Sequence, residues 1–294
     1  MAKSCSIVIP CFNESGAIEK TIREILLALR PDWIKTTEVV VVNDGSTDGS
    51  KETLEQLSME LSDQPFRVIH HSRNLGYGAA LKTGIRRSNA ELICITDADG
   101  TYPNQRIPEL LALGEQHDMV VGARTGDGVD YSKIRSIPKL ILVPWVSFLC
   151  GTNVPDMNSG LRVFHRDIAM NFLNLLPDGF SFTTTITICL LRNRYDVLFT
   201  PISYTKRIGK SHIKPIQDTV RFTQLIARTG MYFAPMRLLS PAVALLGVLF
   251  IVSGLHDVFI LKNITDKTIL FAFSTLNLLM FALLADMIDR RSSN

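Results

Sequence analysis

The chain has 294 residues, in which 31 Lys and Arg residues nearly balance 28 Asp and Glu residues. This balance argues against a general nucleic-acid-binding protein, whose affinity depends on an excess of positive charge. The five cysteines show no paired spacing. That favours reduced thiols over a disulfide framework and is typical of a cytoplasmic domain.

The first 200 residues alternate between short β-branched segments and amphipathic segments, a pattern that predicts an α/β domain. We expect strands over residues 6–10, 39–42, 67–70, 92–96 and 119–121, and helices over residues 18–29, 52–61, 79–87 and 106–113. Nearly continuous apolar strands joined by helices are typical of a mostly parallel sheet with helices on both faces. Ligands bind beyond the carboxyl ends of such strands, so the chemistry should lie directly after them.

Polar turns follow the first two expected strands. Residues 10–15 read PCFNES and residues 43–49 read NDGSTDG. Each turn precedes an expected helix, whose N-terminal amides can favour a phosphate group. Asp44 could accept a hydrogen bond from a base or a ribose hydroxyl. Each turn alone is equally typical of a simple helix cap, so each is ambiguous by itself.

Two carboxylates, Asp97 and Asp99, follow the expected strand over residues 92–96. Held in a turn, such a pair can share a Mg²⁺ or Mn²⁺ ion that bridges the oxygens of a diphosphate and stabilises it as a leaving group. Burying two carboxylates together without a cation would be costly. The alternative is a solvated acidic turn, because Asp-x-Asp alone has little specificity.

Two later motifs add charged groups. Residues 156–162 read DMNSGLR, in which Arg162 could bind phosphate or act as a partner that keeps Asp156 ionised. A purely structural Asp–Arg pair is the alternative. Residues 207–214 read RIGKSHIK. This basic loop suits a catalytic role and equally suits contact with anionic lipid headgroups.

Two apolar segments, residues 238–255 and 268–285, contain no charged residue. Each approaches the roughly 20 apolar residues that a transmembrane helix needs. Basic residues precede the first segment and follow the second, so the positive-inside rule places the N-terminal part and the C-terminus in the cytoplasm. The alternative is a buried hairpin of core helices, for which the preceding chain offers no sufficient apolar surface.

These patterns predict three parts along the chain. They are an α/β domain over residues 1–212, a basic amphipathic segment at the membrane surface over residues 213–236, and two transmembrane helices (about 238–260 and 268–287) with a short tail over residues 237–294. Gly247 and Gly254 lie seven residues apart on nearly one helix face, which would allow close contact with a second copy of the chain.

The motifs form an ordered series, which reads VIPCFNES, VVNDGSTDGS, RNLGYGAALKTGI, DADGTYP, VGARTG, DMNSGLRVF and KRIGKSHIKP, followed by the two apolar segments. This series resembles the inverting family 2 glycosyltransferases, which have the GT-A fold, a Rossmann-like, mostly parallel sheet with helices on both faces. The resemblance covers essentially the whole chain. It is closest to the polyprenyl-phosphate sugar transferases, such as dolichol-phosphate mannose synthase and bacterial undecaprenyl-phosphate glucosyltransferases.

The resemblance implies a donor side that binds a nucleotide sugar and a divalent metal ion, Mg²⁺ or Mn²⁺. The nucleotide would contact Pro10, Asn13, Glu14, Asp44 and Asp97, and the metal ion would be held by Asp97 and Asp99. The family often has Gln two residues after the second metal-binding Asp. This chain has Thr101 there, which offers only a hydroxyl.

The resemblance also implies an acceptor side. The acceptor phosphate would meet Arg124, Arg135, Arg207, Ser211 and Lys214, the last three in a loop that closes over the diphosphate. Asp156, with Arg162 beside it, would occupy the position of the acceptor-side carboxylate, and these two are the catalytic candidates. A phosphate monoester has a second pKa of about 6 and is mostly ionised at neutral pH. Asp156 is therefore expected to orient the acceptor or sugar hydroxyls rather than to remove a proton.

The expected activity is inverting transfer of a hexose from a UDP- or GDP-sugar to a polyprenyl phosphate at the cytoplasmic face of a membrane. A processive polysaccharide synthase is one alternative, but residues 217–222 read QDTVRF rather than the Gln-x-x-Arg-Trp motif, and two spans make a poor channel. A non-catalytic membrane scaffold is another, although Asp97, Asp99, Asp156 and Arg162 are all present. Self-association through the apolar helices is a further expectation.

Overall fold

The computed structural model describes residues 3–29, 33, 35–126, 143–205 and 215–292. The chain divides into two compact units. The first, called here the sheet unit, comprises residues 1–143 and 154–219. The second, called here the hairpin unit, comprises residues 144–153 and 220–294.

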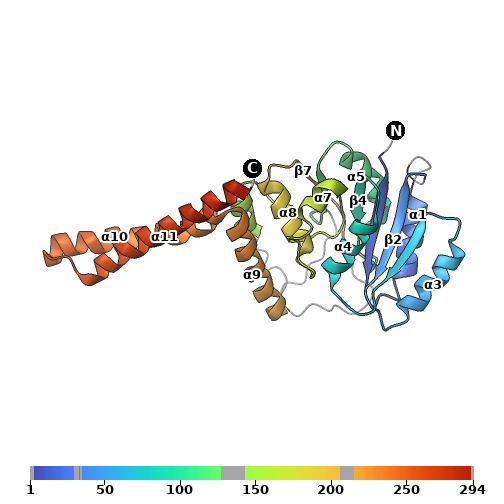
Figure 1. Ribbon diagram of the computed structural model, residues 1–294, viewed down its shortest axis with the longest axis horizontal. Helices are drawn as coiled ribbons and strands as arrows, with labels where there is room; N and C mark the ends of the chain where they lie inside the picture. The colour runs from blue at the N-terminus through green and yellow to red at the C-terminus, as the bar shows by residue number, and fades with distance from the viewer. Residues whose placement is uncertain (1–2, 30–32, 34, 127–142, 206–214, 293–294) are drawn as a thin grey trace. The chain divides into compact units, whose positions relative to one another are not determined.

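A seven-stranded mixed sheet forms the centre of the sheet unit, with strand order β3-β2-β1-β4-β6-β5-β7 (Figure 1). The strands are β1 (Cys5–Cys11), β2 (Thr37–Asn43), β3 (Phe66–His70), β4 (Leu92–Ile95), β5 (Met119–Ala123), β6 (Arg162–His165) and β7 (Val197–Pro201). All neighbouring strands pair in parallel except β6, which is antiparallel to both β4 and β5. The mostly parallel α/β sheet is thus confirmed, while β6 and β7 were not predicted from the sequence.

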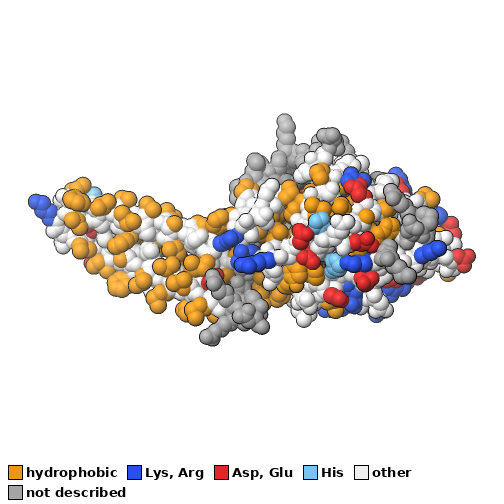
Figure 2. Space-filling view, turned by 90° about the horizontal axis from the view of Figure 1, so that it is seen from above, with side chains coloured by type: hydrophobic (Ala, Val, Ile, Leu, Met, Phe, Trp, Pro, Cys, Tyr) orange, Lys and Arg blue, Asp and Glu red, His pale blue; other side chains and the backbone are white. Residues whose placement is uncertain are grey.

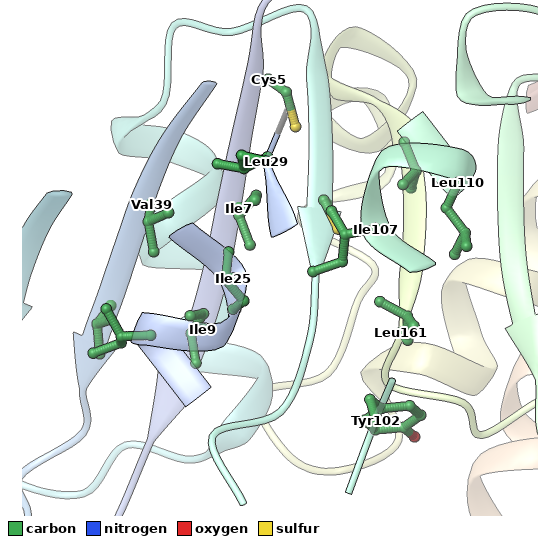
Figure 3. Packing of buried hydrophobic residues seen from close by; sticks show 14 of the residues in the cluster. Cys5, Ile7, Ile9, Ile25, Leu29, Val39, Tyr102, Ile107, Leu110 and Leu161 are labelled. Atoms are coloured by element: carbon green, nitrogen blue, oxygen red, sulfur yellow. The ribbon is translucent and has the colours of Figure 1, made fainter. Parts of the chain in front are cut away.

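Three helices cover one face of the sheet: α1 (Ile18–Ala28), α3 (Ser50–Glu60) and α5 (Ile107–Gly114). In α1 the buried isoleucines are spaced by three or four residues, which puts them on one side of the helix. Figure 3 shows Ile25 of this helix beside Ile7 and Ile9 of β1, with Ile107 of α5 further along the same core. The burial of these side chains drives the sheet and helices together.

The opposite face is covered by α4 (Tyr77–Arg87), α7 (Arg166–Phe172) and α8 (Phe182–Arg192). Helix α4 lies close against β1 because Gly84 has no side chain. A Cβ atom built on Gly84 would lie 2.3 Å from a methyl carbon of Val8. This close approach brings the N-terminal end of α4 to the carboxyl edge of the sheet, where the candidate site lies.

The hairpin unit consists mainly of helices. It contains α10 (Pro235–His256) and α11 (Asp266–Ser292) in full. It also contains the helix over residues 143–150 from residue 144 onward, and α9 (Pro215–Phe233) from residue 220 onward. Helices α10 and α11 run side by side (Figure 1). Residues 235–261 and 266–288 are long and apolar enough to cross a membrane, and only 6% and 11% of their most apolar windows are buried. Figure 2 shows hydrophobic side chains over the visible face of this helix pair. In the described structure they are therefore not buried core helices.

A seam of small residues joins α10 to α11. Cβ atoms built on Gly247 and Gly254 would lie 3.9 Å from Thr275 Cγ2 and 3.8 Å from Thr268 Cγ2. The two glycines, expected to face a second copy of the chain, thus face the neighbouring helix of the same chain. Their small size allows the two helices to approach closely.

A polar cluster lies at the turn between these helices. The side chain of Asp257 is fully buried, and its Oδ2 accepts hydrogen bonds from the Thr265 amide (2.8 Å), the Thr265 hydroxyl (2.6 Å) and the Thr268 hydroxyl (2.7 Å). The hydroxyls of Ser253 and Thr268 are 2.5 Å apart. These bonds connect the end of α10 to the start of α11.

Candidate functional site

The polar motifs gather at the carboxyl edge of the sheet. Strands β1, β2, β4 and β5 all end at this edge, and the antiparallel β6 begins there. The chain from β1 continues to β2 on one side, whereas β4 lies on the other side of β1. Ligands of open α/β sheets bind at such a change of direction.

The loops after β1 and β2 are bound to each other. Asn13, in a left-handed conformation with φ of 57°, accepts a hydrogen bond from the Thr47 amide at 2.7 Å and donates its own amide to Ser46 Oγ at 3.0 Å. The Glu14 amide donates to Ser50 Oγ at 3.0 Å. Pro10 is buried within β1. Asn13 and the Glu14 backbone therefore shape this part of the edge, while Pro10 contributes to the strand beneath it.

Asp44 connects the end of β2 to the glycine-rich segment that precedes α4. Only 2% of this residue is exposed. Its Oδ1 accepts from the Leu75 amide (2.9 Å) and lies 2.7 Å from His71 Nδ1, and its Oδ2 accepts from the Gly76 amide (2.8 Å). His71 Nε2 lies 2.9 Å from the Thr83 hydroxyl. Asp44 thus connects β2 to this segment through three contacts within the protein, and its contact with a nucleotide stays a prediction.

Asp97 and Asp99 lie in the turn after β4, as the sequence predicts. The Tyr77 hydroxyl donates to Asp97 Oδ1 at 3.0 Å. The amide and hydroxyl of Thr101 donate to Asp99 Oδ1 at 3.2 and 2.7 Å. A Cβ atom on Gly160 would lie 2.7 Å from Asp97 Oδ1, so glycine leaves the space that this carboxylate occupies. Thr101 therefore supports Asp99 through both its amide and its hydroxyl.

This carboxylate pair fits a divalent metal ion that is shared with a substrate. Among the described residues, no group of three or more His, Cys, Asp and Glu side chains is arranged to hold a metal ion by itself. Mg²⁺ is commonly held by one or two carboxylates together with substrate phosphates and water. Asp97 and Asp99 match that donor set, in which a diphosphate would complete the coordination.

Arg124 and Asp156 form a buried ion pair beside the end of β5. The Arg124 amide, Nε and Nη2 donate to Asp156 at 3.0, 2.7 and 2.9 Å, and the Asn158 amide donates to it at 3.1 Å. The two side chains are 13% and 3% exposed. The Arg124 guanidinium also lies 5.2 Å from the centre of the Tyr204 ring. Asp156 therefore fixes the orientation of Arg124 at the edge of the sheet.

Arg162, at the start of β6, is fully buried. It donates to the Ser159 carbonyl from Nε (3.0 Å) and Nη2 (2.5 Å), and from Nη1 to the Thr183 carbonyl (2.9 Å) and the Thr187 hydroxyl (2.9 Å). Burial lowers the pKa of Arg162 to about 10. The sequence left open that Arg162 pairs with Asp156. In the structure Arg124 binds Asp156 directly, whereas Arg162 donates to the Ser159 carbonyl and so supports the 156–160 loop.

Four candidate residues lie outside the described part of the chain: Arg135, Arg207, Ser211 and Lys214. Thr205, which precedes the basic loop, donates its amide to the Thr101 carbonyl at 3.1 Å. The chain therefore enters this loop from a position beside the Asp99 turn.

The structure adds aromatic residues that the sequence did not assign. The Tyr102 hydroxyl accepts a hydrogen bond from the Gly160 amide at 2.6 Å, and its ring meets Tyr204 edge-on with centres 5.2 Å apart. Tyr77 stacks on Phe180, with ring centres 5.5 Å apart. Tyr77 and Tyr102 stand within the motifs RNLGYG and DADGTYP. A tyrosine within a glycine-rich turn was the only signal that could have drawn attention to Tyr77.

The sequence matches the family described as "Glycosyl transferase family 2" over residues 6–173, more than half of the chain. An undecaprenyl-phosphate 4-deoxy-4-formamido-L-arabinose transferase of Pseudomonas fluorescens (strain Pf0-1) is 31% identical over 252 residues, which cover 83% of this chain and 71% of that protein. A dolichol-phosphate mannosyltransferase of Mycosarcoma maydis is 31% identical over 134 residues, which cover 44% of this chain and 45% of that protein.

Solved structures with a similar fold include glucosyl-3-phosphoglycerate synthase from Mycobacterium tuberculosis. Its complex with Mn²⁺, UDP and glucosyl-3-phosphoglycerate has a TM-score of 0.57 at 18% identity and covers 77% of this chain and 80% of that chain. Its complex with Mn²⁺, UDP and phosphoglyceric acid has a TM-score of 0.58 at 17% identity, with 78% of each chain covered. At such identity the likeness concerns the fold, and it confirms the GT-A-like mixed sheet.

Proposed function

The chain belongs to glycosyltransferase family 2, and on that premise we propose that it transfers a hexose from a nucleotide sugar to a polyprenyl phosphate. The observation that carries the acceptor class is the exposed apolar helix pair, which joins the same chain as the Asp97–Asp99 turn. The relatives named for undecaprenyl phosphate and dolichol phosphate support the same class. A membrane-embedded enzyme can reach an acceptor that never leaves the membrane.

On the donor side, Asp97 and Asp99 would hold Mg²⁺ or Mn²⁺, which when bound would neutralise the diphosphate as it leaves. The Mn²⁺ complexes of proteins with the same fold support this assignment. Thr101 keeps one oxygen of Asp99 in place. The loops that carry Asn13 and Ser46, which are hydrogen-bonded to each other, would form one wall of the nucleotide site.

On the acceptor side, Arg124 would meet the phosphate of the polyprenyl acceptor, with Asp156 holding the guanidinium in position. The acceptor oxygen is already mostly ionised at neutral pH, so no general base is needed. The arginine would offset the repulsion between the acceptor phosphate and the diphosphate. Attack from the side opposite the leaving diphosphate would invert the anomeric centre in one displacement.

The membrane assignment follows from the two exposed apolar helices. Basic residues before α10 and after α11 would hold the sheet unit and the C-terminus on the cytoplasmic side. The five native cysteines are buried, so labelling of one additional cysteine, introduced at Lys262 or at Asn294, with a membrane-impermeant thiol reagent tests this. The two positions should label from opposite sides of the membrane, and labelling from the same side would refute the spanning hairpin.

The activity is tested with the full-length protein in membranes, radiolabelled UDP- and GDP-sugars, and polyprenyl phosphate. A short chloroform-soluble product that requires Mg²⁺ or Mn²⁺ is the expected result, and Asp99→Asn should abolish it. A long water-soluble polymer would identify a processive polysaccharide synthase instead. No product from any sugar, together with no binding of UDP or GDP, would identify a non-catalytic scaffold.

A further inference from the structure

We propose that Tyr77 is a positioning residue for Asp97, and that Phe180 holds the Tyr77 ring in the orientation this requires. The inference rests on the proposed function in one respect, namely that Asp97 binds the divalent metal ion. It assigns a role to two aromatic side chains in the metal-binding turn of this chain, and it predicts how metal affinity depends on them.

The first support is the placement of the Asp97 carboxylate between two neighbours. On one side the Tyr77 hydroxyl donates to Oδ1 at 3.0 Å. On another side the missing side chain of Gly160 leaves room, because a Cβ atom there would lie within 2.8 Å of both carboxylate oxygens. A hydrogen-bond donor on one side and backbone on the other restrict the rotation of this carboxylate. Such outer partners orient a metal ligand before the metal arrives.

The second support is the chemistry of the Tyr77 hydroxyl. The phenol hydroxyl of tyrosine ordinarily has a pKa of about 10. The hydroxyl is therefore protonated throughout the neutral range and can only donate to an ionised carboxylate. The hydrogen bond to Asp97 is consequently present whenever Asp97 is ionised and ready to bind a cation.

The third support is the rigidity of the backbone that carries Tyr77. The amides of Leu75 and Gly76 are bound by Asp44, and Gly76 has a φ of 108° that favours glycine. On the following side, the Ala79 amide donates to the Asp178 carbonyl at 3.0 Å. Tyr77 is thus held from both sides, by the end of β2 and by the segment before α8.

The fourth support is the exposure of Phe180. Its ring stacks on Tyr77 with an interplanar angle of 20°, yet the residue is 69% exposed. A phenylalanine that exposed gains little from burial in the core, so core packing does not explain its position. Its segment is fixed to α4 by the ion pair between Asp178 and Lys82, with an N–O distance of 2.8 Å. Phe180 therefore restricts the Tyr77 ring by stacking on one of its faces.

The test compares Tyr77→Phe, which removes only the hydroxyl, with Phe180→Leu, which removes only the stacked ring. The matched control is Tyr195→Phe, because Tyr195 contacts Phe172 edge-on and its hydroxyl has no hydrogen-bond partner among the described residues. Purified full-length protein in detergent is titrated with Mn²⁺, with and without UDP, and the free Mn²⁺ is measured by electron paramagnetic resonance. Activity is measured across the same Mn²⁺ range.

We expect Tyr77→Phe to weaken Mn²⁺ binding about tenfold, the lower end of the effect known for partners of metal ligands. The Mn²⁺ concentration for half-maximal activity should rise by the same factor, while kcat at saturating Mn²⁺ changes less. Phe180→Leu should weaken Mn²⁺ binding by a smaller factor, roughly threefold if the ring restricts Tyr77 only in part. Tyr195→Phe should leave both quantities unchanged.

Equal Mn²⁺ affinity in the wild type and in Tyr77→Phe, within twofold, would overturn the inference. If Tyr77→Phe lowers the thermal midpoint strongly, the decision passes to Phe180→Leu, which retains the hydroxyl. An unchanged Mn²⁺ affinity in Phe180→Leu would then overturn the inference. A wild type that binds Mn²⁺ but transfers no sugar to polyprenyl phosphate would refute the proposed function alone, because the Mn²⁺ titrations do not require turnover.

Discussion

The sheet unit and the hairpin unit place the same kinds of side chain in opposite surroundings. In β1 every residue is buried, whereas in α10 and α11 apolar side chains such as Val252 and Phe273 are more than half exposed. Apolar side chains turned outward along two long helices are consistent with the membrane location proposed above. Apolar side chains avoid water in both units on this interpretation: in the sheet unit they pack in a core, and in the hairpin unit they would contact lipid.

The polar groups differ in the same way. In the sheet unit they gather at the carboxyl edge, where Arg124 and Asp156 neutralise each other. In the hairpin unit the polar side chains that link α10 to α11 meet at the turn, where hydroxyls surround Asp257. The first arrangement lies at the edge where we propose that the substrates bind, and the second connects two helices.

Breaking the buried pair in the sheet unit should have the largest effect. Arg124→Ala removes a neighbouring positive charge and two side-chain hydrogen bonds from the buried Asp156 carboxylate, which costs about 3–5 kcal/mol of folding free energy. The matched control is Lys51→Ala, since Lys51 and Glu55 form an ion pair with both side chains about half exposed. That variant should lose at most about 0.5 kcal/mol. Thermal unfolding of the full-length protein measures both, and equal losses would contradict the buried character of the pair.

The introduction of an arginine at an exposed apolar position of each unit tests whether the two surfaces contact different solvents. Val248→Arg puts a charge near the middle of α10 and should cost about 2.5–3.5 kcal/mol of membrane insertion. Leu27→Arg changes an apolar side chain that is also exposed but lies on α1. It should alter stability by no more than about 0.5 kcal/mol. The fraction of protein that resists alkaline extraction from membranes reports insertion, and full resistance of Val248→Arg would argue against a spanning α10.

Two glycine substitutions sharpen the contrast between a ligand edge and a helix seam. Gly160→Ala should lower turnover on the order of tenfold to a hundredfold, because the new methyl group displaces the Asp97 carboxylate. Gly254→Ala adds a methyl group at an ordinary contact distance from Thr268 and should leave turnover unchanged. Both are measured as kcat and as Mn²⁺ affinity. Normal activity of Gly160→Ala would show that Asp97 needs no such space.

The smallest effect is expected in the polar cluster of the hairpin. Thr268→Val removes a hydroxyl that donates to Asp257 and lies 2.5 Å from the Ser253 hydroxyl. Hydrogen bonds of this kind contribute about 0.6 kcal/mol and at most about 1.7 kcal/mol in membrane proteins. Thr275→Val is the control, since Thr275 donates to the Phe271 carbonyl of its own helix. Unfolding in sodium dodecyl sulfate measures the stability of both variants. A larger loss of stability in Thr275→Val would show that the polar cluster at the turn is not the main contact between α10 and α11.

The elements that the sequence predicted are those whose signal is local. Five strands, the helices between them and both apolar helices follow from runs and periodicities within about 20 residues. The Asp97–Asp99 turn was found for the same reason, since it directly follows a buried apolar strand. A residue that directly follows a buried strand lies at the sheet edge, so its place in the sequence was enough to predict its place in the site.

The contacts that the sequence could not predict join distant residues. Asp156 lies 32 residues from its partner Arg124, yet the sequence offered Arg162, six residues away, as the nearer candidate. Strand β6 reads RVFH, in which only two apolar residues stand between Arg162 and His165, so its pattern does not differ from that of a loop. The bond from Tyr77 to Asp97 depends on that same packing. Local patterns predict elements, whereas these pairs require the assembled sheet.

The division into units has a consequence for dissecting the protein. The chain passes between the units three times, because residues 144–153 leave the sheet unit and return to it before the final departure at residue 220. Within the hairpin unit, the Arg237 side chain donates to the Phe148 and Leu149 carbonyls at 3.3 and 3.2 Å. A chain ended at residue 219 would keep this short insert but lose its partners. In the order of the chain, part of the hairpin unit is thus inserted between two segments of the sheet unit, and no single cut separates the two units.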